Sequence, residues 1–427
     1  MTLHTTYFLL SSLLLPIMFF SLTAFADTLT FNILNCGAKP DGSIAASLTF
    51  NVVDYGAKPD NTKFDSAKAF QSAWTHACSS SKAATIYVPK AKFYISSATF
   101  NGPCKNNAIT LKMDGTLVAP SNFQLTAQSK NWILFRQVNG VTVSGGVIDG
   151  QGSGLWACKQ SGKTCPRGTT SLEFTNSQNI LISGLTSLNS QIYHIVMNKC
   201  RNVKMESLNI YAPANSPNTD GIDLEETTYA TILDSNIGTG DDCISLGHGT
   251  FNVFIQNVFC GPGHGISVGS LGRKEKENGV QNVTVQSCRL SNTQNGVRIK
   301  SWGRPSTGFG RDIRFQHITM TNVKYPIIID QNYCPHHQDC PGQDSGVKIS
   351  NVTYQSIYGT SATLVAIKMD CSPKFPCKGI VLDDVKLTYK NGKAKASCSH
   401  AQGFDVDLVE PTGCFYSRAT EEFLSSI

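Results

Sequence analysis

A short pattern of alternating apolar and polar residues recurs along most of the chain. Each copy opens on a small or polar residue, alternates, turns, and closes with a second alternating pair, as in NILISGLTSLNS from Asn179 and NVKMESLNI from Asn202. These two copies are 23 residues apart, and the interval lengthens to 30 from Asn252 to Asn282. Alternation at period two indicates strands, and its recurrence at a nearly fixed interval indicates stacked repeats. Further copies begin at Tyr229, Asp312, Val347 and Gly379.

The repeat is too short for a strand–helix–strand crossover but has room for three or four short strands joined by turns. It therefore predicts an all-β solenoid, the right-handed parallel β-helix, in which each coil pairs with the next. Leucine-rich repeats would need a leucine signature that is missing, and a β-sandwich would need hairpin signals that are sparse. Only 15% of residues are charged and 36 are glycine, a balance that suits strands and many turns.

A solenoid leaves open ends that must be covered. The stretch DSAKAFQSAWTHAC from Asp65 has apolar residues at helical spacing, and Asp65 or Ser66 can serve as N-cap. We predict an N-terminal capping helix whose buried face consists of Ala67, Phe70, Ala73, Trp74 and Ala77.

The first residues carry the features of a targeting signal. An apolar run ends in the small-x-small pattern Ala24-Phe25-Ala26, which predicts a secretory signal peptide over residues 1–26. An uncleaved membrane anchor is the alternative. Residues 27–49 are an extra segment, because FNILNCGAKPDG from Phe31 is nearly repeated by FNVVDYGAKPDN from Phe50. We assign the second copy to the first coil, and residues 50–427 to a single β-helix catalytic domain.

Fifteen cysteines in a secreted chain predict disulfides. Because the count is odd, at least one thiol stays unpaired within the monomer, and Cys36 in the duplicated segment is the candidate. The stretch CPHHQDC from Cys334 could form a metal cluster, but an oxidising compartment favours a disulfide loop. Two glycosylation sequons start at Asn282 and Asn351 and fit secretion. The predicted pairs are Cys158–Cys165, Cys334–Cys340, Cys371–Cys377, Cys398–Cys414 and Cys243–Cys260.

The formal net charge is +6, and no run of Lys or Arg resembles an arm that binds nucleic acid. The simplest interpretation of this charge is a soluble protein with a slightly basic surface. A more specific interpretation is that the protein binds an acidic partner.

Chemically active residue types follow the second strand of successive repeats. Because strand pairing holds adjacent coils roughly 4.8 Å apart, these residues should line one groove on the order of 20 Å long. The set consists of Asp220, the pair Asp241 and Asp242, His264 in GPGHG, Arg298 and Lys300 in RIK, and Tyr333.

Such a groove fits an elongated polymer and acid–base chemistry. Like charges in a shared site raise the pKa of one carboxyl group, so that one can stay protonated as an acid while its neighbours are anionic. Cleavage of a glycosidic bond needs this division of roles. Arg298 and Lys300 are two apart on a strand, point to one side, and suit a carboxylate on the substrate. The simplest alternative for each Asp is turn chemistry, and GTGDD lacks the Lys-Ser/Thr of a phosphate loop.

The ordered motifs NTDG, GDD, GHG and RIK resemble those of the polygalacturonases of glycoside hydrolase family 28, and the similarity extends from Phe50 to Cys414. The resemblance implies a right-handed parallel β-helix that hydrolyses α-1,4-galacturonosyl bonds of pectin with inversion, without metal or organic cofactor. GISVGSLGR and the paired cysteines of the last third resemble plant members, with a lean to the exo-acting group over the endo-acting one.

The resemblance also assigns roles to individual residues. Asp241 would be the general acid, Asp220 and Asp242 would hold and activate water, and His264 would tune the acid. Arg298 and Lys300 would bind the galacturonate carboxylate, and Tyr333 would position a sugar ring. Asn218 would orient the site. The expected partner is homogalacturonan, bound by a monomer in the cell wall or apoplast, with no membrane association after signal cleavage.

Two rival functions stay open. A pectate lyase shares the architecture but uses Ca²⁺ and a basic residue to eliminate, whereas this chain offers a histidine and three carboxylates. A non-catalytic wall-binding protein is the second rival, and the intact set of aspartates argues against it.

Overall fold

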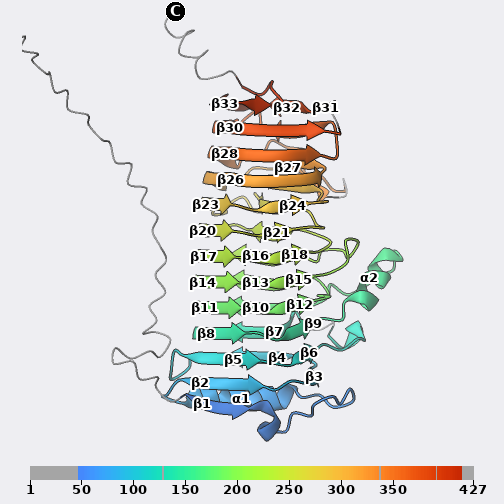
Figure 1. The fold of residues 1–427 in the computed structure, drawn as a ribbon, viewed down its shortest axis with the longest axis vertical. Helices are drawn as coiled ribbons and strands as arrows, with labels where there is room; N and C mark the ends of the chain where they lie inside the picture. Colours follow the sequence, from blue (N-terminus) through green and yellow to red (C-terminus); the bar gives the residue numbers. More distant parts are fainter. Residues whose placement is uncertain (1–46, 127–128, 336–337, 391, 416–427) are drawn as a thin grey trace, which may run out of the picture. The chain divides into compact units, whose positions relative to one another are not determined.

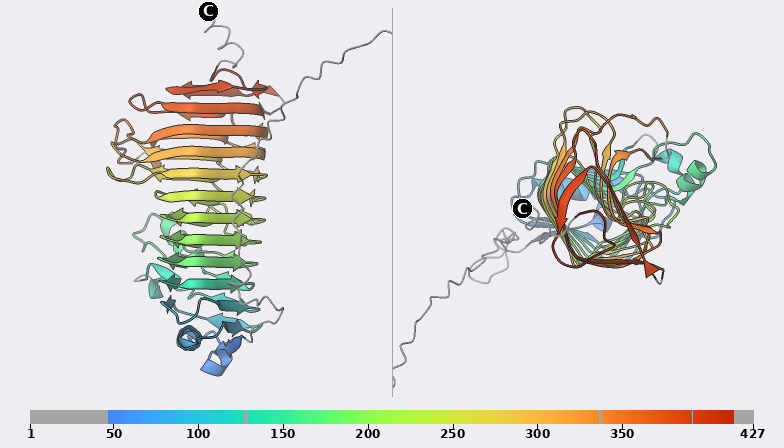
Figure 2. Two further views of the ribbon diagram at one scale, coloured as in Figure 1. Left: turned by 90° about the vertical axis from the view of Figure 1, so that its left-hand side faces the viewer. Right: turned by 90° about the horizontal axis from the view of Figure 1, so that it is seen from above.

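The computed structural model describes residues 47–126, 129–335, 338–390 and 392–415, which belong to one compact unit. The predicted signal peptide, most of the duplicated segment and Cys36 lie outside these ranges. Strands stack as the rungs of a single column, from β1 at one end to β33 at the other (Figures 1 and 2). No helix in the described ranges is long and apolar enough to span a membrane.

Most coils contribute three strands, each paired in parallel with its counterpart in the next coil, as the right-handed parallel β-helix requires. In the described ranges the strands form sheets of 23 and 11 members. The larger sheet contains the first and second strands of each coil, which merge into single long strands in β26, β28 and β30 and are separate again in the last coil. The smaller sheet contains the third strands.

The first strands are β1 Leu48–Asn51, β2 Ala84–Val88, β5 Ile109–Met113, β8 Asn139–Ser144, β11 Gln178–Ser183, β14 Arg201–Glu206, β17 Thr228–Leu233, β20 Thr250–Gln256, β23 Val280–Gln286, β26 Phe309–Val323, β28 Lys348–Ser361, β30 Cys377–Tyr389 and β33 Ala401–Asp405. The second strands are β3 Lys92–Tyr94, β6 Thr116–Val118, β9 Val147–Asp149, β12 Thr186–Leu188, β15 Asn209–Tyr211, β18 Asn236–Gly238, β21 Phe259–Cys260, β24 Arg289–Ser291 and β34 Val409–Glu410. The third strands are β4 Ala98–Asn101, β7 Asn131–Arg136, β10 Thr170–Thr175, β13 Ile195–Asn198, β16 Ile222–Glu225, β19 Ile244–Leu246, β22 Ile266–Leu271, β25 Asn295–Trp302, β27 Tyr325–Tyr333, β29 Val365–Asp370 and β32 Lys395–Ser399. The remaining elements are β31 Gly392–Lys393, which is antiparallel to β30, the helices α1 Ala67–Ser79 and α2 Ser153–Gln160, and the 3₁₀ turns η2 Val52–Tyr55 and η3 Phe123–Leu125.

The asparagine that opens many copies of the repeat has a structural role. Asn179, Asn202, Asn252 and Asn282 all have positive φ near 55–59°, a left-handed conformation that asparagine adopts more readily than most residues. Their side chains stack from coil to coil: Asn202 Nδ2 donates to Asn179 Oδ1 at 2.6 Å, and Asn282 Nδ2 donates to Asn252 Oδ1 at 2.7 Å. The repeat thus marks a corner of each coil.

The core is a stack of like residues, and α1 closes it. The Phe135 ring lies 4.8 Å from Phe100 and 4.5 Å from Phe174, centroid to centroid, and Trp74 of α1 packs 5.3 Å from Phe100. All five apolar positions predicted for the helix are buried. Ser66 occupies the N-cap position, while Asp65 Oδ1 accepts the hydrogen bond from the Ala67 backbone N–H.

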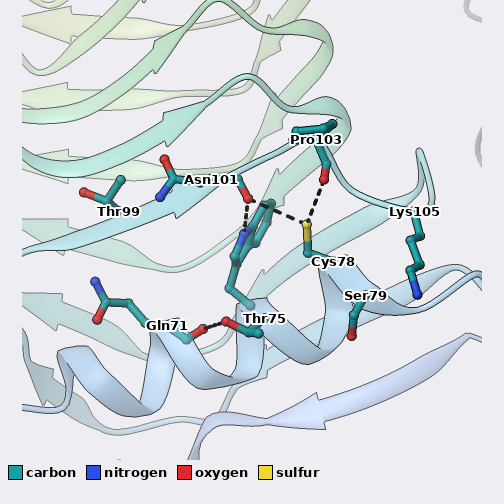
Figure 3. A pocket seen from close by; sticks show the side chains of 9 residues that line it. Gln71, Thr75, Cys78, Ser79, Thr99, Asn101, Pro103 and Lys105 are labelled. Atoms are coloured by element: carbon teal, nitrogen blue, oxygen red, sulfur yellow. Dashed lines mark hydrogen bonds between the residues drawn. The ribbon is translucent and has the colours of Figure 1, made fainter.

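A depression of about 500 Å³ lies beside α1 and is lined by polar side chains such as Gln71, Thr75 and Lys105 (Figure 3). Trp74 Nε1 donates to the Asn101 carbonyl at 2.9 Å. The disulfide Cys78–Cys104 joins the helix to the second coil. It was not predicted, because its two cysteines are 26 residues apart and only cysteines close in sequence were paired.

The five predicted disulfides are all present. Cys200 and Cys288 are additional unpaired cysteines that the odd count did not locate. Both are buried, and burial raises the pKa of each thiol to about 12. They are therefore expected to stay protonated and unreactive.

Phe135 sits within the aromatic stack, so Phe135→Ala should lower the free energy of unfolding by about 3–5 kcal/mol. Phe259→Ala is the matched control, because that ring is 41% exposed on β21, and it should change stability by less than about 0.5 kcal/mol. Denaturant unfolding followed by circular dichroism measures both. Equal effects would contradict a core held by stacked rings.

Candidate active site

Asp220, Asp242 and His264 occupy equivalent positions in three successive coils. Each lies in the loop between the second and third strands: β15 to β16, β18 to β19, and β21 to β22. Gly221 N–H donates to the Asp242 carbonyl, and Cys243 N–H donates to the Gly265 carbonyl, which continues the parallel ladder into these loops. The three residues are therefore stacked at the spacing of neighbouring strands, about 4.8 Å.

Arg298 and Lys300 lie on a third strand, β25, and Tyr333 ends the next one, β27. They come after the second strand of their coils, as the sequence pattern predicted, but lie within the third strand and not in the loop before it, where the aspartates lie. The register explains their proximity to the aspartates, because Ser267 of β22 pairs with Arg298, and Lys300 pairs with Asp330 of β27.

Asp242 is fully buried and forms the centre of an ion cluster. Its Oδ1 accepts hydrogen bonds from Arg298 Nη2 at 2.6 Å and Ser267 Oγ at 2.9 Å, and its Oδ2 accepts one from Lys300 Nζ at 2.6 Å. The sequence predicted a substrate-binding role for the two cations, and the structure adds that both are held by Asp242.

The cluster stabilises its own charges. Burial alone would lower the pKa of Lys300, and Arg298 adds to that, but Asp242, Tyr333 and Asp241 raise it above its usual value. The Tyr333 ring centroid lies 5.1 Å from Lys300 Nζ and 5.4 Å from the Trp302 ring. Tyr333 is thus next to the cations, as a residue that positions a sugar would be.

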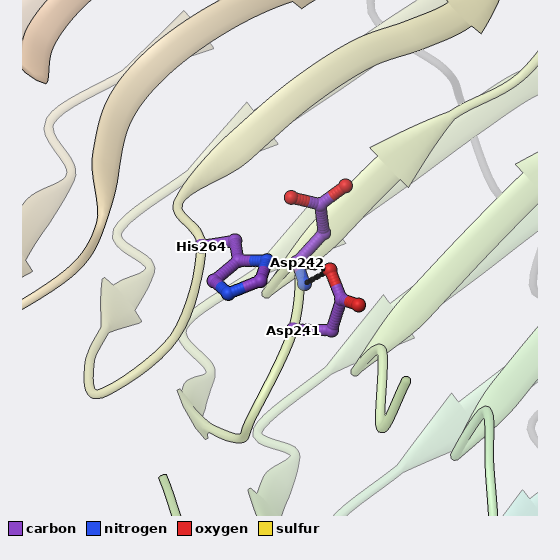
Figure 4. A group of neighbouring side chains, drawn as sticks. All are labelled: Asp241, Asp242 and His264. Carbon is purple, nitrogen blue, oxygen red and sulfur yellow. Dashed lines mark hydrogen bonds and ion pairs between the residues drawn. The ribbon is translucent and has the colours of Figure 1, made fainter. Parts of the chain in front are cut away.

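His264 contacts Asp241 through both its side chain and its backbone. Its Nδ1 lies 2.8 Å from Asp241 Oδ1, and its backbone N–H donates to the Asp241 carbonyl at 2.7 Å. Gly263 permits this approach, since its φ is +152° and an added Cβ would lie 2.8 Å from the same carbonyl. The side chains of Asp241 and His264 are 18% and 35% exposed, so both can meet a substrate. Figure 4 shows the carboxylates of Asp241 and Asp242 pointing in different directions from adjacent positions.

Crowding of the carboxylates was expected to raise the pKa of the acid, Asp241. In the structure the pKa of Asp220 is raised instead, and that of Asp241 is lowered. Burial raises the pKa of Asp241, but the hydrogen bond and charge of His264, with the charges of Lys300 and Arg298, lower it to about 2. In Asp220, burial and the neighbouring charges of Asp241, Asp223 and Asp242 raise the pKa well above its usual value. The free protein therefore keeps a proton on Asp220 more readily than on Asp241.

Asn218 is exposed and adopts a left-handed conformation with φ of 56°. Its Nδ2 donates to Asp241 Oδ2 at 3.4 Å, the oxygen that His264 leaves free. The orienting role of Asn218 stays a prediction.

Asp223 is a fourth carboxylate that the sequence motifs did not single out. It lies on β16, where it pairs with Ser245 of β19, and its buried Oδ1 has no hydrogen-bond partner. Burial and the charges of Asp242 and Asp241 raise its pKa well above the usual value. Its only sequence signal is a polar residue at an alternating position of a third strand.

Asp241, Asp242 and His264 could be taken for a metal site, because they offer ligand atoms within 4.8 Å of one another. The donor set argues against this. Both oxygens of Asp242 are already held by Arg298 and Lys300, whose fixed positive charges oppose a further cation.

The fold and the site define an acid–base enzyme built on a β-helix, with accessible and buried carboxylates beside two fixed cations. Residues 78–410 match the family described as Glycosyl hydrolases family 28, and the chain belongs to that family. It is accordingly a glycoside hydrolase.

The comparisons with known proteins agree on this point. The chain is 58% identical over 406 residues to a polygalacturonase of Prunus persica, covering 95% of this chain and 98% of that relative. It is 41% identical over 360 residues to an exopolygalacturonase of Arabidopsis thaliana, covering 83% and 80%. Among solved structures, an endo-xylogalacturonan hydrolase from Aspergillus tubingensis shares the fold with a TM-score of 0.74 at 22% identity, covering 87% of this chain and all of that one.

Asp223→Asn should stabilise the protein at neutral pH. A carboxyl group with a raised pKa binds more protons when folded, so its ionisation lowers stability as pH rises above about 3.9 toward the raised value. The amide removes that cost. We expect the melting temperature at pH 7 to rise by about 1–3 °C and the gain to vanish near pH 3. Asp234→Asn, at an exposed turn, is the control, and a gain that is independent of pH would contradict the explanation.

Proposed function

We propose that the protein is a secreted polygalacturonase that hydrolyses α-1,4-galacturonosyl linkages of polygalacturonate with inversion. The observation that carries the proposal is the group formed by Asp220, Asp241, Asp242 and His264 on adjacent coils, with Arg298 and Lys300 beside it. Three carboxylates supply acid and base, and the cations suit a polymer that carries a carboxylate on every sugar. The polygalacturonase of Prunus persica, 58% identical, supports this substrate.

Asp241 is the general acid in this proposal, and Asp220 with Asp242 holds the attacking water. Asp241 Oδ2 is the oxygen that can protonate the leaving group, because Oδ1 is bound to His264 at 2.8 Å and Oδ2 has only the long 3.4 Å contact with Asn218. To act as the base, Asp220 has to be ionised before water is deprotonated; once ionised, its raised pKa makes it the stronger proton acceptor.

An acid with a pKa of about 2 would be ionised in the free protein, so substrate must change its environment. Lys300 and Arg298 contribute to lowering the pKa of Asp241. A galacturonate carboxylate bound near them would offset their charge and raise the pKa of Asp241. Proton transfer is thereby coupled to the charge of the substrate.

The stereochemical outcome rests on the family resemblance. Inverting glycosidases commonly place their two carboxyl groups about 6.5–9.5 Å apart, whereas Asp241 and Asp242 offer oxygens within 4.8 Å. This short separation argues against Asp242 as the base, so we assign the base role to Asp220, while Asp242 chiefly fixes the cations.

Secretion is proposed from the apolar N-terminal run and from six disulfides among the described residues. Homogalacturonan in the cell wall is the expected partner of the monomer, and no metal or organic cofactor is required by the proposed roles.

We further propose exo action over endo action. Helix α2 projects from the same side of the column as β12, β15 and β18 (Figure 1). Gln160, its last residue, donates a hydrogen bond to the carbonyl of Asn215, in the loop that carries Asp220. A rigid element beside the acids is what would restrict a polymer to end-on binding, and exopolygalacturonases occur among the relatives.

Asp241→Asn should reduce the release of reducing ends from polygalacturonate by about 10²–10⁴-fold, because the amide cannot donate the required proton. The fold should be unchanged, since the amide oxygen can still accept a hydrogen bond from His264. Reducing-sugar assays and circular dichroism measure these two results, with Asp234→Asn as control. Full activity of Asp241→Asn would refute the assignment of the acid.

Product analysis on polygalacturonate should give galacturonate monomer from the earliest time points, as exo action requires. An early spread of oligomers would establish endo action instead. Absorbance in the ultraviolet from an unsaturated product would indicate a lyase and overturn the proposed hydrolysis.

A further inference from the structure

The row of active-site residues continues one coil beyond Asp220, toward the N-terminus. Ile195 of β13 pairs with Ile222 of β16, and His194 N–H donates to the Asp220 carbonyl at 2.8 Å. This register places Tyr193 at the position equivalent to Asp220 in the preceding coil, about 4.8 Å away along the column. The half-buried Tyr193 ring is thus the next member of the series that includes Asp242 and His264.

An arginine lies against this ring. The guanidinium carbon of Arg167 is 5.8 Å from the Tyr193 ring centroid, and the Arg167 side chain is exposed. Within the described ranges, no carboxylate lies within ion-pair distance of Arg167, in contrast with Arg298 and Lys300, which are both held by Asp242. Burial, the largest effect, raises the pKa of Glu173 on β10 above its usual value, although the charge of Arg167 lowers it.

The segment that carries Arg167 is firmly anchored. The disulfide Cys158–Cys165 closes it, and its start is joined to the Asp220 loop by the Gln160 hydrogen bond. Beyond Arg167, Gln191 Oε1 accepts a hydrogen bond from the Thr169 backbone N–H. The backbone that carries Arg167 is thus held at both ends, so ligand binding has to order the side chain but not the loop.

A second cation lies on the same segment. Lys159 of α2 is half-buried, and its pKa is lowered by burial and by the positive charge of Arg167. Because the charge of Arg167 disfavours the charged form of Lys159, and neither is paired with a carboxylate among the described residues, Lys159 would gain from an anion bound nearby.

The chemistry of this group matches a sugar acid. Arginine binds carboxylates through paired N–H donors, and an aromatic ring offers a flat apolar face with a polar tip. We propose that Arg167 and Tyr193 form a sugar-binding subsite on the N-terminal side of the carboxylates, which takes a uronate ring of an anionic polysaccharide. Arg167 binds the sugar carboxylate and Tyr193 contacts the ring. The inference rests on the proposed function. In this arrangement the three aspartates, Asp220, Asp241 and Asp242, have cations on both sides: Arg167 on one and the Arg298–Lys300 pair on the other.

Arg167→Gln tests the subsite, and Arg201→Gln is a matched control. Arg201 also lies over a tyrosine, 5.0 Å from the Tyr229 ring centroid, but on the larger sheet, which carries none of the proposed catalytic or substrate-binding residues. On polygalacturonate, Arg167→Gln should lower kcat/KM by about ten- to a hundredfold, mainly through KM, as expected for a lost hydrogen bond to a charged group. Arg201→Gln should change kcat/KM less than about twofold, as expected away from the site.

Two further measurements distinguish a role of Arg167 in substrate binding from a role in stabilising the loop that carries it. Arg167→Lys keeps the charge and should recover part of the loss, while the melting temperature of all three variants should match the parent. In the inactive Asp241→Asn background, Arg167→Gln should weaken binding of trigalacturonate by about tenfold or more, measured by calorimetry.

The two hypotheses fail in different ways. A parent protein that releases no reducing ends from polygalacturonate contradicts the proposed function. An active parent whose Arg167→Gln variant behaves like Arg201→Gln, or loses kcat at unchanged KM with unaltered trigalacturonate binding, overturns the subsite alone.

Discussion

The parallel backbone ladder between coils is the constraint on which the rest of the structure depends. It fixes which residue of one coil lies over which residue of the next, so side chains distant in sequence meet at strand spacing. Asp220, Asp242 and His264 come together only because Gly221 pairs with Asp242, and Cys243 with Gly265, through backbone hydrogen bonds. A slip of one residue would send these side chains to the other face. The asparagine stack at the corner helps to hold the register, because each amide bonds its equivalent in the neighbouring coil.

Within that frame, Asp242 organises the charges of the site. Its two oxygens hold Arg298 and Lys300 at 2.6 Å each, in a place closed to solvent. Breaking a buried pair by removing one partner commonly costs about 3–5 kcal/mol, because it leaves an uncompensated charge. Removal of Lys300 would therefore disturb Asp242 as well as any bound substrate, and the loss of activity would not isolate carboxylate recognition. An arginine outside the cluster, such as Arg167, reports on substrate charge more cleanly.

The sequence was sufficient for the architecture because its strand alternation recurs at coil spacing, and five disulfides followed from cysteines close in sequence. Cys78–Cys104 escaped, since only the packing of α1 on the second coil brings these residues together. Asp223, Ser267 and Tyr193 also escaped. Each is a single polar or aromatic residue in an ordinary strand or turn, and its importance depends on register across coils. The pKa of Asp241 could not be predicted either, because His264 reverses the effect that crowded carboxylates alone would have.

The lowered pKa of Asp241 connects recognition of the substrate charge to proton transfer. In the free protein the hydrogen bond and charge of His264, with the charges of Lys300 and Arg298, lower the pKa of Asp241, whereas burial and neighbouring carboxylates raise the pKa of Asp220. A neutral sugar would leave this balance unchanged, whereas a uronate carboxylate beside the cations would offset their charge and raise the pKa of Asp241. In the proposed mechanism, a polyanionic chain thus favours the protonated form of Asp241 that the acid role requires. Because the cations of the ion cluster are fixed by Asp242, they need no reorganisation when an anionic sugar binds beside them.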